Sequence, residues 1–91
     1  MRVGKKLEEL SRRLNQLKVE IAVADEQLVH FSEVLDRAET DMVVGGDPLS
    51  RRAHQEAKAD FDRHKRQRDA LIQEVSNIRR KQDALLDEMP R

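Results

Sequence analysis

The stretch Gly45-Gly46-Asp47-Pro48 separates two long segments, and no other glycine or proline occurs between residues 5 and 89. Glycine readily takes the left-handed conformation that often follows the last residue of a helix. An Asp side chain can accept hydrogen bonds from the free N–H groups at a helix start, and proline fits the first helical position. The sequence therefore predicts a helix over about residues 3–42, a turn over 43–47 and a helix over about 48–89, which Pro90 ends.

The first segment carries an unbroken heptad pattern. Its apolar residues follow one another at alternating steps of four and three, as at the a and d positions of a left-handed coiled coil. These residues, which form the first seam, are Val3, Leu7, Leu10, Leu14, Leu17, Ile21, Ala24, Leu28, Phe31, Leu35, Ala38 and Met42.

The second segment has the same spacing but a less apolar seam. Its C-terminal half is mostly aliphatic, whereas its N-terminal half places two histidines and an arginine at seam positions. The second seam consists of Ser50, His54, Ala57, Phe61, His64, Arg68, Leu71, Val75, Ile78, Gln82, Leu85 and Met89.

Folding the second seam onto the first predicts an all-α fold, an antiparallel two-helix coiled-coil hairpin that forms one domain over residues 1–91. Seam residues that face each other then have numbers that sum to 92, which places Phe31 opposite Phe61. Large or polar side chains face small ones in this register, as a packed interior requires. These pairs are Arg68–Ala24, His54–Ala38 and Leu35–Ala57.

Charged residues beside the seam give a mixed signal. The attractive pairs across the hairpin are Lys6–Glu88, Asp25–Lys65 and Glu39–Arg51, and the like-charged pairs are Arg13–Lys81 and Glu20–Glu74. Each exposed pair contributes only a few tenths of a kcal/mol, so packing sets the register. The like-charged side chains either extend into water or are neutralised by a second copy of the chain.

The composition favours long helices over a compact globule. Charged residues make up 40% of the 91 residues and aromatic residues 2%, the net charge is zero, and cysteine is absent. Without cysteine the chain forms no disulfide, which suits the cytoplasm. No apolar run follows residues 1–6, so we expect no signal peptide, and no stretch reaches the roughly 20 apolar residues that a membrane-spanning helix needs. We expect a soluble, cytoplasmic protein that does not associate with membranes.

No residue pattern points to catalysis, to a cofactor or to a metal. His54 and His64 are ten residues apart, nearly three helical turns, so they cannot share a metal ion. The serines have no neighbouring base and acid, and Gly45-Gly46 lacks the Lys and Ser/Thr of a phosphate-binding loop. We therefore expect a protein that is not an enzyme.

Charge is divided between the two limbs of the hairpin near the turn. Residues 19–49 contain eight acids and one base, whereas residues 51–68 contain seven bases and three acids. Either the limbs compensate each other, or they form a bipolar surface for a charged partner. Direct nucleic-acid binding is not expected, because the acidic limb lies only ~10 Å from the basic one and repels phosphates.

The turn itself is a candidate interaction site. Carboxylates surround two valines that we expect to be exposed, which indicates a surface that docks onto a protein. The candidate tip residues are Glu39, Asp41, Val43, Val44 and Asp47. The first functional interpretation is therefore a non-enzymatic protein–protein interaction or scaffold module.

An antiparallel hairpin with an acidic tip resembles, in architecture, the transcription factors that insert such a hairpin into the secondary channel of bacterial RNA polymerase. In that family the tip carboxylates are brought to the catalytic metal. The resemblance covers the shape and the acids, and the sequence shows no tip motif of that family. It implies an alternative function, regulation of a nucleic-acid machine through the acidic tip.

Apolar residues outside the seam suggest self-association. Ala22, Val29, Ile72 and Leu86 lie on one side of the predicted hairpin. A two-helix hairpin covers each seam residue on one side only, so its core is thin. We expect a homodimer, a four-helix bundle with two-fold symmetry, in which these four residues form the interface.

Overall fold

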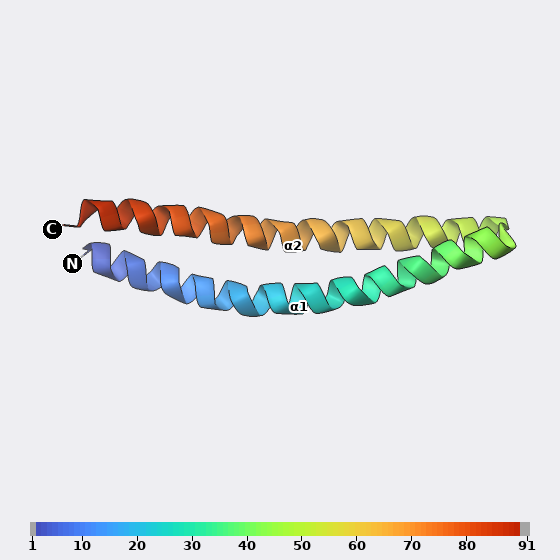
Figure 1. Ribbon diagram of the computed structural model, residues 1–91, viewed down its shortest axis with the longest axis horizontal. Helices are drawn as coiled ribbons and strands as arrows, with labels where there is room; N and C mark the ends of the chain where they lie inside the picture. Colours follow the sequence, from blue (N-terminus) through green and yellow to red (C-terminus); the bar gives the residue numbers. More distant parts are fainter. Residues whose placement is uncertain (1, 90–91) are drawn as a thin grey trace.

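Two helices account for nearly all of the chain. The computed structural model describes residues 2–89, with α1 spanning Arg2–Gly45 and α2 spanning Pro48–Glu88. Figure 1 shows the helices side by side, with the start of α1 and the end of α2 at one end of the rod and the turn at the other. The rod measures 68 × 17 × 14 Å. The predicted all-α antiparallel hairpin is confirmed, whereas the predicted stop at Pro90 lies outside the described residues.

The turn is shorter than the sequence indicated. Helix α1 continues through the two valines to Gly45, three residues past its predicted end, and only Gly46 and Asp47 connect the helices. Gly46 alone takes the left-handed conformation, with φ of 61°. One such residue is enough to end a helix, and nothing in Val43 or Val44 forbids helical geometry.

Helix α2 begins with the predicted cap. The backbone of Asp47 is extended, and its Oδ1 accepts a hydrogen bond from the backbone N–H of Ser50 at 2.7 Å. Pro48 occupies the first helical position, where no hydrogen bond is lost. The guanidinium of Arg51 donates to the carbonyl oxygen of Gly46 at 3.2 Å, which ties α2 back to the turn.

Both predicted seams face inward. Every residue of the first and second seams is buried or half-buried. Full burial is nevertheless rare in residues 2–89, as expected where each helix is covered by a single neighbour. The buried apolar residues are Leu17, Leu28, Ala38, Ala57 and Ile78.

Polar contacts across the hairpin define which residues lie level with each other. Three of them join residues whose numbers sum to 93, one more than the predicted sum. They are Asp25–Arg68, Glu39–His54 and Ser11–Gln82. Any residue of α1 is therefore level with the α2 residue that completes a sum of about 93.

The aromatic layer differs from the prediction. Phe31 stacks on His64, with ring centroids 4.0 Å apart and ring planes 17° apart, and it contacts His30 edge-on at 5.4 Å. Within the part of the chain that the structure describes, Phe31 and Phe61 form no such ring pair. Phe61 instead lines a groove with Leu28 on one face of the rod.

Candidate functional site

The most exposed large apolar side chains described in the structure gather at the turn. Val43 is 81% exposed, Val44 83% and Leu49 77%. The extension of α1 carries both valines, and Leu49 is the second residue of α2. The two valines were predicted from the sequence, whereas Leu49, one residue before seam residue Ser50, was not. We call Val43, Val44 and Leu49 the apolar tip.

The acids predicted at the tip have three different environments. Hydrogen bonds from Ser50 lower the pKa of Asp47 below its ordinary value, and they commit this carboxylate to capping α2. Glu39 lies 3.6 Å from Nε2 of His54. Asp41 is exposed, and no ion pair joins it to another described residue. Of the three predicted carboxylates, Asp41 is therefore the one held by neither a cap nor an ion pair.

A shallow groove of about 420 Å³ runs along α1 beside the apolar tip. Val43 and Val44 line it together with Asp36, Glu39 and Thr40. The Thr40 hydroxyl donates to the backbone carbonyl of Asp36 at 3.0 Å, so it is satisfied within the helix. The groove thus presents two valines beside carboxylates, and its lining contains no basic side chain.

The residues predicted to form a dimer interface are all exposed. Val29 is 59% exposed, Ile72 46% and Leu86 53%, and Ala22 is exposed as well. Their heptad positions, b on α1 and e on α2, place them on one side of the rod. We call this side the Val29 face, defined by Ala22, Val29, Ile72 and Leu86.

A groove of about 440 Å³ lies in the middle of the Val29 face. Leu28, Val29, Ser32 and Phe61 line it between charged walls. The α1 wall is acidic and the α2 wall is basic, with Asp25 and Glu33 on the first and Lys65 and Arg68 on the second. The face is therefore both apolar and bipolar.

The acidic and basic limbs compensate each other only in part. One ion pair joins them, Asp25–Arg68 at 3.0 Å, and Glu39 lies 3.6 Å from Nε2 of His54. Other bases, such as Arg52 and Arg63, pair with acids of their own helix. Among residues 2–89, acid–base contacts shorter than 4.0 Å leave out five acids of residues 19–49 and four bases of residues 51–68. These are Glu26, Glu33, Asp36, Asp41, Asp47, Arg51, Lys58, Lys65 and Arg66.

The predicted like-charged pairs were Arg13–Lys81 and Glu20–Glu74. The structure instead joins Arg13 to both glutamates within one chain. Arg13 reaches across the hairpin and binds Glu74 with two hydrogen bonds, of 2.7 and 3.2 Å, and its guanidinium also lies 3.3 Å from Glu20. The hydrogen bond with Glu74, followed by the charge of Glu20, raises the pKa of Arg13. A second copy is therefore not needed on this side. The predicted attractive pairs also change, since Asp25 pairs with Arg68 and Glu39 with His54.

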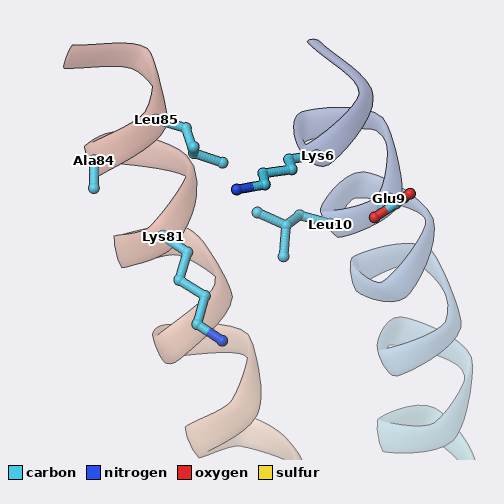
Figure 2. Close-up of a pocket in the computed structure, with 6 residues that line it drawn as sticks. All are labelled: Lys6, Glu9, Leu10, Lys81, Ala84 and Leu85. Carbon is cyan, nitrogen blue, oxygen red and sulfur yellow. The ribbon is translucent and has the colours of Figure 1, made fainter. Parts of the chain in front are cut away.

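A groove of about 340 Å³ opens between the helices at the end opposite the turn. Figure 2 shows Lys6, Leu10 and Leu85 pointing into the space between α1 and α2. Glu9, Lys81 and Ala84 complete its lining. Its lining contains no nucleophile with an adjacent base.

The described residues offer little for chemistry. In residues 2–89 no three His, Asp or Glu side chains come close enough to hold a metal ion. His64 is stacked on Phe31, and His54 lies beside Glu39. Neither of the two described helices contains a stretch long and apolar enough to span a bilayer.

Comparisons with known proteins identify no relative. No protein-family model, no curated protein and no solved structure matches this chain. A function for the chain must therefore be inferred from the surfaces of the rod.

Proposed function

We propose that the chain is a non-enzymatic protein–protein interaction or scaffold module that docks through its apolar tip. The observation that carries this proposal is the exposure of Val43, Val44 and Leu49, each at least 77% accessible to solvent. Burying a Val or Leu side chain contributes roughly 1.5–3 kcal/mol. Three such side chains at the end of a 68 Å rod form a small anchor of the kind that dominates protein interfaces.

The charges around the apolar tip indicate the chemistry of the partner. Glu39 and Asp41 lie on α1 just before the valines, and Asp36 borders the adjoining groove. A protein surface with an apolar pocket and a basic rim on the side of α1 complements this arrangement. Nucleic acid does not, because its phosphates meet these carboxylates first.

The alternative function, a hairpin regulator of a nucleic-acid machine, depends on tip acids that are free to reach a metal. Asp47 caps α2 and Glu39 lies beside His54, so this alternative relies on Asp41. The variant Asp41→Asn separates the two proposals, since it removes the carboxylate and leaves the apolar tip intact. Docking through the tip predicts that binding survives this substitution.

The proposal also includes self-association through the Val29 face. A two-helix hairpin with so few buried residues gains stability when a second layer covers it. A dimer leaves the apolar tip, at the end of the rod, available to the other partner. Asp36 lies where the two surfaces adjoin, since it borders the tip groove and occupies a b position on the side of the Val29 face.

The test of tip docking compares matched pairs of valines on α1. Val43→Ser/Val44→Ser alters the tip, and Val19→Ser/Val23→Ser alters two exposed valines along the same helix, 65% and 47% exposed. Proteins captured by the immobilised wild type are purified and titrated against each variant by calorimetry. The proposal predicts at least about tenfold weaker binding for the tip variant and little change for the control. Equal binding by both variants contradicts it.

A further inference from the structure

We propose that a second copy of this chain covers the Val29 face in a parallel arrangement, with the two apolar tips at the same end. This inference rests on the self-association proposed above and specifies its geometry. The reason lies in acids of α1 and bases of α2 that the hairpin leaves without ion pairs, because in this orientation they lie level with opposite charges of the second copy.

The chain exposes more surface than its mass requires. Its accessible surface is 7030 Å², whereas a compact monomer of 10.6 kDa exposes about 5,500 Å². The excess is larger than the roughly 800 Å² that each partner buries in a standard protein interface. The exposed surface of the rod is therefore large enough for a second copy to form an interface of standard size.

The Val29 face is divided lengthwise by charge. On α1 it carries Glu33 and Asp36, and on α2 it carries Lys58 and Lys65, all four outside the ion pairs of the hairpin. The partner must be basic over α1 and acidic over α2, and it must present apolar groups to Val29 and its neighbours. A second copy of the chain satisfies all three conditions, because each limb of one copy complements the other limb of the next.

A two-fold axis along the rod brings these limbs together. Such an axis places α1 of one copy over α2 of the other without shifting the level along the rod. Residues whose numbers sum to about 93 are level, so Ala22 of one copy meets Ile72 of the second copy. Asp36 likewise meets Lys58 of the second copy. The apolar and the charged contacts are then made in the same register.

The antiparallel arrangement does not match these charges. A two-fold axis perpendicular to the rod places α2 of one copy over α2 of the other, running in the opposite direction. Because α2 spans Pro48–Glu88, residues at equal distances on either side of its midpoint then lie level with each other. Lys58 of one copy then lies close to Arg79 of the other. Like charges at such a position oppose association, and the acids of α1 find no basic limb opposite them.

The parallel dimer has a consequence for docking. Both apolar tips project from one end of the bundle, and the starts of α1 and ends of α2 gather at the other. A partner with two copies of a receptor pocket then binds bivalently, with an effective concentration that one tip alone does not provide.

Charge reversal of the two limbs tests the arrangement. The acid-limb variant is Glu33→Lys/Asp36→Lys, and the base-limb variant is Lys58→Glu/Lys65→Glu. Each alone sets like charges against each other in the parallel dimer, so we expect dimerisation about tenfold weaker or more by sedimentation equilibrium. An equimolar mixture of the two variants restores opposite charges at both contacts, and we expect a heterodimer with close to wild-type affinity.

Controls separate folding from association. Circular dichroism verifies that each variant remains helical, and the charge-removing variants Glu33→Gln/Asp36→Asn and Lys58→Gln/Lys65→Gln should weaken the dimer less than reversal. Glu9→Lys/Glu88→Lys makes the same change of charge on the opposite face and should leave affinity within about threefold of wild type.

The possible failures are distinct. A wild type that is monomeric at high micromolar concentration overturns self-association together with its geometry. A dimer whose reversed variants stay dimeric, or do not recover on mixing, overturns the parallel arrangement alone. Neither outcome affects docking through the apolar tip, which the valine variants test separately.

Discussion

Phe31 lies face to face with His64, 4.0 Å away between ring centroids, although Phe61 is closer to its own level in the rod. Side chains of a helix lean toward the N-terminus of that helix. Phe31 therefore leans away from the turn, whereas Phe61, on the opposite helix, leans toward it. The two phenylalanines diverge, and Phe31 meets the next seam residue of α2.

This stacking predicts a specific energetic coupling. In a double-mutant cycle with Phe31→Leu and His64→Leu, we expect a coupling free energy of roughly 0.5–1 kcal/mol from urea unfolding, because the substitutions remove an aromatic pair. The corresponding cycle with Phe31→Leu and Phe61→Leu should give a value near zero. A larger coupling in the second cycle than in the first would show that the phenylalanines pair with each other.

The two glycines of the turn should differ in their tolerance of a side chain. At Gly46, with φ of 61°, alanine is strained, and we expect Gly46→Ala to destabilise the hairpin by about 1 kcal/mol. Gly45 is helical, and an added Cβ would meet Ser50 Oγ at 3.5 Å, an ordinary contact. Gly45→Ala should therefore leave stability unchanged or raise it by up to ~1 kcal/mol in thermal unfolding. Equal losses at both positions would contradict this assignment.

The Asp47 cap should make stability depend on pH. Because hydrogen bonds from Ser50 lower its pKa, the carboxylate stabilises the folded state at pH above its ordinary pKa of 3.8. This contribution is lost as the pH falls through the lowered folded-state value. We expect Asp47→Ala to lower the melting temperature by roughly 5 °C at pH 7 and by less below pH 3.

Replacement of Asp47 by serine provides the control for that experiment. Serine caps helices without a charge, so Asp47→Ser should keep most of the melting temperature at pH 7. A loss for Asp47→Ala that is the same at pH 7 and at pH 2.5 would show that the carboxylate does not act as the cap.

Arg13 should stabilise the hairpin by separating two carboxylates. It binds Glu74 and lies beside Glu20, so Arg13→Met leaves these acids facing each other. We expect a melting temperature a few degrees lower, with a smaller loss in 0.5 M salt than in 20 mM salt because salt screens the repulsion. Glu20→Gln in the same background should recover part of the loss. Arg12→Met is the matched control. An equal decrease in its melting temperature would show that the contacts of Arg13 with Glu74 and Glu20 do not stabilise the hairpin.

The seams were predictable from the sequence because they depend on spacing alone. Every step of four and three places a residue on the same stripe of its helix. The short connection at Gly46 and Asp47 allows α2 to run only antiparallel to α1. Spacing does not determine the direction in which a side chain points along the rod, nor the contacts that a long side chain makes. The partners of Phe31 and Arg13 therefore required the structure.

The tip was predictable only in part. The exposed valines and acids follow from their position between the two seams. Whether a carboxylate is available to a partner depends on the backbone geometry of the turn. The extended backbone of Asp47 places its carboxylate where it accepts a hydrogen bond from Ser50 and caps α2. Leu49 was missed because a helix of this hairpin has apolar residues at many positions outside its seam, and only its 77% exposure distinguishes it.

A fluorescent label at the tip tests the central claim most directly. The chain has no cysteine, so Val44→Cys and Val19→Cys each accept one environment-sensitive fluorophore, at the tip and on the outer side of α1. The purified protein partner is titrated into each labelled chain. Docking through the apolar tip predicts a blue shift at position 44 and none at position 19. A shift at position 19 with none at position 44 would show that the partner binds along the rod and would contradict the account.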